Sequence, residues 1–305
     1  MRHFSSDAIS HLAKPPAERP LLIFSHGNSF PASTYSVMLV ELSRLGYEVR
    51  ALERLGHDPR YPVTQNWPHL VTQLAEFIAQ QAGLHQGPVF LAGHSLGGFL
   101  SLMTACQHPV LGGKTMGGVV LMDSPLVGGW RAKLLKFAQT TRLAGRFPPG
   151  AISRQRRNRW ISQEEVLGHY SSKASFAKWH PQVLQDYITY GTHDENGERV
   201  LSFTREVETA IYNCLPHHVE TLLQKHPPRF PVSFIGGEQS LELRQAGLAL
   251  TRQVVGRRLT MLPGSHLFPM ESPLETAAAV DAALRDLAAA PPISSLTSEA
   301  LGVTA

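Results

Sequence analysis

The stretch that decides the fold is residues 88–98, PVFLAGHSLGG, in which an apolar run meets a serine flanked by glycines. Residues 88–93 predict a buried strand, and the residues after Ser95 change to the spacing of a helix. A sharp turn between strand and helix lifts the serine hydroxyl out of the sheet, where it can reach a substrate. Ser95 is therefore the candidate nucleophile, and it needs a base from elsewhere in the chain.

The segments around this turn alternate between strand and helix patterns. Further buried strands are predicted at 21–27, 47–52 and 117–123, and helices at 31–45 and 67–83 separate the first of them. The strands are apolar throughout, as expected when both faces of a parallel sheet are covered. The alternation predicts an α/β fold with a mostly parallel, doubly wound sheet.

The alternation stops at Pro125 and returns with strand patterns at 231–237 and 257–264. The intervening residues are rich in Arg, Trp and His and hold no convincing strand, so we expect a mainly helical insertion that forms a cap or lid. The expected domains are a core of residues 1–125 and 231–290, the cap of residues 126–230, and a flexible C-terminal tail of residues 291–305.

Length and composition exclude several classes of protein. The chain has 305 residues, of which 43% are hydrophobic and 17% charged, so it can bury a large core and is not of the disordered type. No apolar run reaches the roughly 20 residues of a membrane-spanning helix, and residues 1–14 lack the apolar stretch of a signal peptide. Cys106 and Cys214 have no CxxC or metal-type neighbours, so reduced thiols and a cytoplasmic location are expected.

Positive charge is concentrated in one stretch of the expected cap. Residues 130–160 contain Arg and Lys but no Asp or Glu, whereas the rest of the chain is net acidic although the net charge is +4. No aromatic motif of a nucleic-acid-binding fold accompanies the stretch, so no nucleic-acid partner is expected. It is either a solvated helical face or the source of a field that attracts an anionic substrate or a membrane surface. The sequence leaves the oligomeric state open.

Position in the chain selects a base for Ser95 among the 15 histidines. The loop after the last predicted strand, LPGSHLFPMESP, carries His266. Loops at the carboxyl ends of parallel strands converge on one crevice, so we expect His266 to reach Ser95. His94, beside the serine, points the other way on the tight turn, and we expect it to be structural.

A tetrahedral intermediate also needs two hydrogen-bond donors for its oxyanion. The backbone N–H of Leu96 is one candidate, because it opens the helix after the serine and has no partner within that helix. The other donor should come from a loop after an early strand. The segment SHGNSF at 25–30 is placed for this, with the N–H of Asn28 as the expected donor.

These segments carry a resemblance to a known family. The sequence resembles the α/β-hydrolase superfamily over roughly residues 20–290, because FSHGNSFP, LAGHSLGG and LPGSHLFPMESP match its oxyanion loop, nucleophile elbow and histidine loop in order. The resemblance implies an α/β-hydrolase fold, a Ser95–His266 pair and a cap domain inserted after the sixth core strand. A serine at the nucleophile position is unlike the dehalogenase and epoxide-hydrolase branches, which the resemblance associates with Asp there.

The sequence departs from the superfamily at the acid of the triad. In most members the acid follows the strand before the histidine strand, and here the corresponding position holds Ser240. Asp123, which ends the predicted strand at 117–123, is the favoured acid, because some members supply it from that position. Glu238 is the alternative acid, and Glu242 or no acid at all also remain open.

Together these residues predict a serine hydrolase of the esterase or lipase type. Ser95 attacks a carboxylic ester, His266 transfers the proton and Asp123 orients the imidazole, so that an acyl-enzyme forms and is hydrolysed. No metal or organic cofactor is expected, because the chain has no HExxH, clustered Cys/His ligands or phosphate-binding GxxxxGK[ST].

The predicted substrate is a hydrophobic or lipid-like small molecule. A thioester or a carbon–carbon bond is an alternative that uses the same triad, and a non-catalytic ligand-binding protein that keeps the hydrolase shell is another. Several aromatic residues of the cap either line an apolar pocket or belong to its core. They are Trp130, Phe137, Trp160, Phe176 and Trp179.

Overall fold

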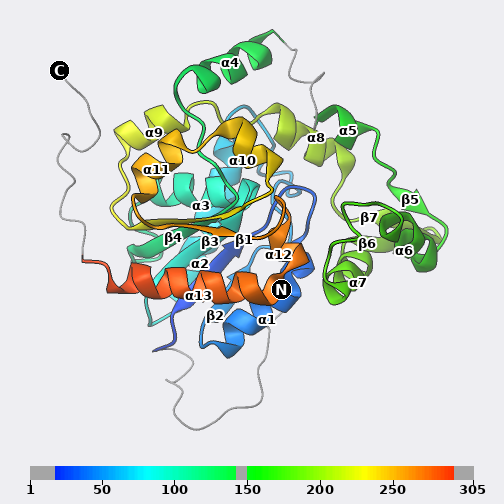
Figure 1. Cartoon of the computed structure of the whole chain (residues 1–305), viewed down its shortest axis with the longest axis horizontal. Helices are drawn as coiled ribbons and strands as arrows, with labels where there is room; N and C mark the ends of the chain where they lie inside the picture. Colours follow the sequence, from blue (N-terminus) through cyan, green and yellow to red (C-terminus); the bar gives the residue numbers. More distant parts are fainter. Residues whose placement is uncertain (1–17, 142–149, 292–305) are drawn as a thin grey trace.

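A six-stranded parallel sheet forms the centre of the protein. The computed structural model describes residues 18–141 and 150–291, and the predicted tail from residue 292 onward lies outside them. The strand order is β2-β1-β3-β4-β8-β9, and the prediction of a mostly parallel, doubly wound sheet is confirmed (Figure 1). The strands are β1 (Leu21–Ser25), β2 (Glu48–Ala51), β3 (Val89–His94), β4 (Met116–Met122), β8 (Val232–Gly237) and β9 (Leu259–Leu262).

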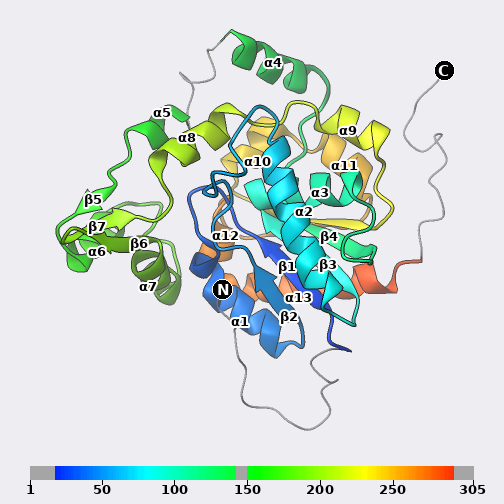
Figure 2. The same ribbon diagram turned by 180° about the vertical axis from the view of Figure 1, so that it is seen from behind.

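Helices cover both faces of the sheet (Figures 1 and 2). α1 (Ser36–Arg44) and α13 (Pro273–Ala289) pack against each other on one face, whereas α2 (Pro68–Gly83) and α3 (Leu96–Gln107) pack together on the other. Four short helices lie in the connections of the core. They are η2 (Ala32–Tyr35), α10 (Leu241–Ala246), α11 (Ala249–Val255) and α12 (Phe268–Glu271).

Strand β1 shows why the core strands are apolar at every position. Leu21 and Ile23 point into the cluster beneath α2 and α3, whereas Leu22 and Phe24 point into the cluster beneath α1 and α13. Successive side chains of a strand face opposite sides of the sheet. Since helices bury both sides, neither set can be polar without the loss of its hydrogen-bonding partners.

The segment between β4 and β8, here called the cap segment, leaves the sheet after its fourth strand in chain order, where the resemblance implied the sixth. Most of its described elements are helices, as expected. Its elements are α4 (Gly129–Thr140), α5 (Gly150–Arg154), β5 (Arg159–Trp160), α6 (Gln163–Ser171), α7 (Pro181–Tyr190), β6 (Thr192–Glu195), β7 (Glu198–Leu201), α8 (Arg205–Asn213) and α9 (Val219–Lys225).

The expectation that the cap segment holds no strand is wrong. Strands β5, β7 and β6 form a small antiparallel sheet, and β6 and β7 are the two arms of a hairpin. The turn between them is Asn196-Gly197, and both residues have positive φ, at 53° and 83°. An Asn-Gly pair with positive φ at both positions is the preferred two-residue hairpin turn.

The aromatic residues of the cap segment divide into two groups. Trp160 and Trp179 are 1% and 5% exposed and belong to a core cluster that also contains Tyr170 and Tyr187. Trp130 and Phe137 on α4 are instead 67% and 61% exposed.

Within residues 18–141 and 150–291, no helix is both long enough and apolar enough to cross a bilayer.

Two glycines allow three backbone segments to meet at the end of β3. A Cβ on Gly93 would lie 2.2 Å from the carbonyl carbon of Gly97, at the start of α3. A Cβ on Gly97 would lie 1.9 Å from the carbonyl oxygen of Ser25, at the end of β1. Both distances are shorter than any non-bonded contact, so only glycine permits α3 to begin this close to β1 and β3.

We expect Gly97→Ala to lower the free energy of unfolding by about 3 kcal/mol or more, because the added methyl group meets backbone that cannot move aside. The matched control is Gly168→Ala in helix α6, where a Cβ would have no neighbour within 4 Å. This control should raise stability by about 0.5–1 kcal/mol, as alanine does in helices. Urea unfolding measures both, and equal stability of the two variants would contradict the packing argument.

Candidate active site

Ser95 occupies a strained turn between β3 and α3. Its φ of 51° and ψ of −116° are unusual for a residue with a side chain. Strain of this size persists only where surrounding contacts hold it, and it is common at functional sites. One such contact is the hydrogen bond of 2.9 Å from the Ser95 N–H to the carbonyl of Met122 in β4.

The two predicted oxyanion donors lie on either side of this turn. Leu96 is the first residue of α3, and Asn28 lies in the loop after β1. Neither backbone N–H donates to an acceptor among the residues that the structure describes. At the beginning of a helix, the positive end of the helix dipole also stabilises an anion that binds to an unpaired N–H. Both groups are therefore free to bind an anionic oxygen.

Ser95 and His266 lie on the wall of the same cavity, which has a volume of about 320 Å³. Asn28 also lines it, and so do Tyr212 from α8 and Leu241 from α10. The loops after β1, β3, β8 and β9 all contribute residues. The carboxyl ends of the parallel strands thus converge on one crevice, in which a hydroxyl, an imidazole and backbone donors are assembled.

His94 is buried behind the elbow and braces it. Its Nδ1 lies 2.7 Å from the Tyr35 hydroxyl, and its Nε2 lies 2.8 Å from the carbonyl oxygen of His266. Burial lowers the pKa of the His94 imidazole to about 3, so the ring is neutral at neutral pH. His94 therefore links the turn at Ser95 to the loop that carries His266. These contacts agree with the structural role that we expected for His94.

Asp123 lies next to His266. Its Oδ1 is 3.2 Å from His266 Nδ1, although the imidazole is not aligned for a hydrogen bond. Catalytic hydrogen bonds of this kind are often loose before substrate binds. Asp123 is fully buried and has a positive φ of 41°, which turns its side chain at the end of β4.

The other carboxylates that were considered are less well placed. Glu238 is exposed and makes no ion pair with His266 among the described residues. The carboxylate of Glu242 is 4.0 Å from His266 Nδ1, but the side chain is 53% exposed. A buried carboxylate interacts more strongly with an imidazole than an exposed one, because water screens the exposed charge. The structure therefore brings Asp123 to His266 and leaves Glu238 apart.

Ser240 and Gly237 hold the Asp123 carboxylate, and sequence reasoning did not identify this function. The Ser240 hydroxyl donates to Oδ1 over 2.8 Å, and the Gly237 N–H donates to Oδ2 over 2.8 Å. Ser240 stands where most members of the superfamily have the acid, so the side chain that replaces the acid supports Asp123. The sequence signal for this function was the serine at position 240, where most members have the acid.

Within residues 18–141 and 150–291, no three His, Cys, Asp or Glu side chains are grouped as metal ligands would be.

Burial raises the pKa of the Cys106 thiol to about 12, so this sulfur stays protonated and is a poor nucleophile.

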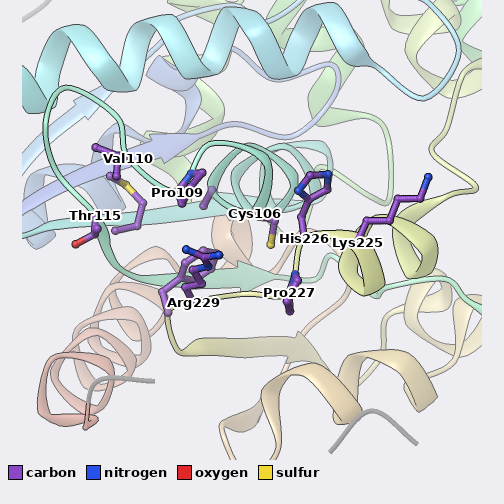
Figure 3. A pocket seen from close by; sticks show the side chains of 11 residues that line it. Cys106, Pro109, Val110, Thr115, Lys225, His226, Pro227 and Arg229 are labelled. Carbon is purple, nitrogen blue, oxygen red and sulfur yellow. The ribbon is translucent and has the colours of Figure 1, made fainter. Parts of the chain in front are cut away.

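A second cavity, of about 230 Å³, contains none of the predicted site residues. Figure 3 shows that its lining comes from the end of α3, from the residues around the start of β4, and from residues 225–230, which lead into β8. These are the amino-terminal ends of β4 and β8. The cavity therefore lies at the opposite edge of the sheet from Ser95.

Comparison with known families identifies the class of protein to which the fold belongs. The model of the alpha/beta hydrolase family matches residues 22–279, and the chain belongs to this family.

Two curated relatives share sequence with the chain. It is 27% identical over 180 residues to a monoglyceride lipase homolog of Monkeypox virus, and 29% identical over 158 residues to the monoglyceride lipase of Rattus norvegicus. These matches cover 55% and 47% of the chain, and 62% and 50% of the relatives. The chain thus matches about half to three fifths of the length of each relative.

Solved structures share the fold at low sequence identity. The peroxisomal alpha-beta-hydrolase Lpx1 of Saccharomyces cerevisiae has a TM-score of 0.68 and 16% identity, and the match covers 93% of this chain and 82% of that one. The E-2-(acetamidomethylene)succinate hydrolase has a TM-score of 0.64 and 21% identity, with 87% and 91% covered. Identities this low support the fold and leave the substrate open.

Proposed function

We propose that the protein is a serine hydrolase that cleaves carboxylic esters of hydrophobic or lipid-like molecules. The observation that carries the proposal is the arrangement of three side chains. Ser95 stands on a strained turn, it shares a cavity with His266, and His266 lies 3.2 Å from the buried Asp123. This is the order of contacts that an acyl-transfer triad requires.

The reaction proceeds through an acyl-enzyme. Since Nδ1 of His266 is beside Asp123, Nε2 is the nitrogen that takes the Ser95 proton as the hydroxyl oxygen attacks the ester carbonyl. The N–H groups of Asn28 and Leu96 bind the oxyanion of the tetrahedral intermediate. His266 then protonates the leaving alkoxide, and water repeats the sequence on the acyl group to release the acid and restore Ser95.

The choice of an ester substrate draws on the relatives as well as on the site. Both curated relatives are named for monoglyceride lipase, and a monoglyceride is a carboxylic ester with one long acyl chain. Apolar residues from two separate parts of the chain, Phe30 in the loop after β1 and Leu241 at the start of α10, line the cavity beside Ser95. A site of this kind favours an apolar acyl or alkyl group next to the scissile carbonyl.

We expect a fluorophosphonate probe to label Ser95 and the protein to hydrolyse p-nitrophenyl esters. Ser95→Ala should abolish labelling and lower the rate of hydrolysis by at least about a thousandfold, because the nucleophile is lost. A panel of increasing acyl chain length, with acyl thioesters beside it, identifies the preferred leaving group. A folded wild-type protein that is neither labelled nor active would favour the non-catalytic binding protein instead.

The identity of the acid is tested separately. Asp123→Asn should lower kcat by about a thousandfold or more, since the imidazole loses the charge that orients and stabilises it. Glu238→Gln and Glu242→Gln should keep kcat within about tenfold of the wild type, because these side chains are exposed. Ester hydrolysis is measured with circular dichroism as a check on folding. Loss of activity in Glu238→Gln together with an active Asp123→Asn would reverse the assignment.

We further propose that helix α4 attracts the protein to an anionic lipid surface. Trp130, Leu134 and Phe137 are 67%, 57% and 61% exposed, and their spacing places them on one face of the helix. Lys133 and Lys136 lie on the same helix, and the sequence holds no acidic residue between Asp123 and Glu164. A helix with an exposed apolar face and only basic charges has the composition of an interfacial helix.

Co-sedimentation with phosphatidylserine-containing vesicles tests this attraction. Binding should weaken about fivefold with each of Lys133→Gln and Lys136→Gln, and it should weaken as salt increases. The triple variant W130A/L134A/F137A should lose most of the binding. Leu84→Ala is the matched control, because Leu84 is 81% exposed but lies at the end of α2. Equal binding by the triple variant and the wild type would refute the proposal.

A further inference from the structure

Glu208 of helix α8 contacts the loop that carries the Asn28 donor from the cap segment. Glu208 accepts a hydrogen bond of 2.5 Å from the Ser29 hydroxyl through Oε1. Its backbone carbonyl accepts a second bond, of 3.1 Å, from the side-chain amide of Asn28. Glu208, Ser29 and Asn28 are all buried, with exposures of 5%, 4% and 5%. Residues about 180 positions apart in the chain are therefore joined beside the cavity.

The charge of Glu208 is balanced within the cap segment. Arg156 Nη1 lies 3.0 Å from Glu208 Oε2, and Nη2 donates to the hydroxyls of Tyr170 and Tyr187. A lone carboxylate this close to an oxyanion site would repel the negative charge that develops in the transition state. With Arg156 paired to it, Glu208 can accept hydrogen bonds from the loop without presenting a full uncompensated charge. Helices α5 and α8 lie side by side (Figures 1 and 2). The Arg156–Glu208 pair joins α8 to the residues that directly follow α5.

The loop needs such an external contact because its backbone is strained. Ser29 has a φ of 79°, in the left-handed region that a residue with a side chain seldom adopts. On the other side of the loop, the Gly27 N–H donates to the Tyr35 hydroxyl over 3.0 Å. The core thus fixes the first part of the loop, and the cap segment fixes the second, through Glu208 and the aromatic rings that pack on Phe30. Between these two contacts lies the peptide N–H of Asn28.

We propose that Glu208 is a positioning residue for the oxyanion site, so that the site is complete only while α8 is seated on the loop. The inference rests on the proposed hydrolase function and adds a dependence of catalysis on the cap segment. When α8 lifts away, Ser29 loses its acceptor and the Asn28 side chain loses the Glu208 carbonyl. The loop can then relax toward ordinary φ values, which turns the Asn28 N–H away from the oxyanion. Ser95, His266 and Asp123 are unaffected by that change.

Steady-state kinetics on a p-nitrophenyl ester with Ser29→Ala and Glu208→Ala tests the inference. Each variant should lower kcat by about 10- to 100-fold, less than or equal to the loss of a whole oxyanion donor, and KM should stay within about threefold. The double variant should lose little more than either single one, since both remove the same contact. Glu208→Gln should recover most of kcat, because its amide oxygen can accept from Ser29. The pH profile of kcat/KM should not shift, as the histidine and its acid are untouched.

Controls separate positioning from simple destabilisation. Glu206 lies on the same helix, and its side chain is 74% exposed. Glu206→Ala should therefore leave kcat within about twofold of the wild type. Glu208→Ala also leaves Arg156 unpaired, so thermal melting is recorded for every variant. Ser29→Ala keeps the Arg156–Glu208 pair and decides the matter if Glu208→Ala does not fold.

The possible results distinguish failure of the positioning inference from failure of the hydrolase proposal. Unchanged kcat in Ser29→Ala, or fully additive losses in the double variant, overturns the positioning inference while an active wild type keeps the hydrolase proposal. A wild type that is inert and unlabelled by the fluorophosphonate probe overturns the hydrolase proposal, and the inference falls with it.

Discussion

The close approach of three backbone segments at the nucleophile turn is the constraint on which the site depends. Gly97 lies so near the carbonyl of Ser25 that no larger residue fits, and this contact sets where α3 begins relative to β1. The start of α3 in turn sets the strained conformation of Ser95 and directs the Leu96 N–H. Because β1 also leads into the Asn28 loop, one packing contact fixes the relation between the candidate nucleophile and both candidate donors.

Sequence reasoning predicted the parts of this arrangement that depend on local pattern. The core strands have apolar residues on both faces, and a Gly-x-Ser-x-Gly between a strand and a helix has few structural interpretations. His266 followed from the rule that strand ends converge at one edge of a sheet. The acid was harder, because Asp123 and Glu238 both follow strands. Only the three-dimensional path of each loop shows that Asp123 is buried beside the imidazole and that Glu238 faces solvent.

What the sequence did not predict depends on contacts between distant residues. The hairpin arms Thr192–Glu195 and Glu198–Leu201 are short, and the first is polar, so they lack the pattern of a strand and are defined mainly by their turn. The hydrogen bonds from Asn28 and Ser29 to Glu208 join residues about 180 positions apart, and no local rule relates them. The exposure of Trp130 was likewise invisible, because an aromatic residue on a helix is compatible with a core or a surface.

The position of Asp123 has a consequence for how the protein can diverge. Ser95 and Asp123 follow the neighbouring strands β3 and β4, and main-chain hydrogen bonds join the Ser95 N–H to Met122 and the Asp123 N–H to Ile235. The proposed nucleophile and the proposed acid are thus both fixed by hydrogen bonds to the sheet. The segment after β8 gives Asp123 a supporting hydrogen bond from Ser240 and lines part of the cavity. Insertions beyond Ser240 could therefore accumulate there during evolution and reshape the mouth of the crevice without displacing Ser95 or Asp123.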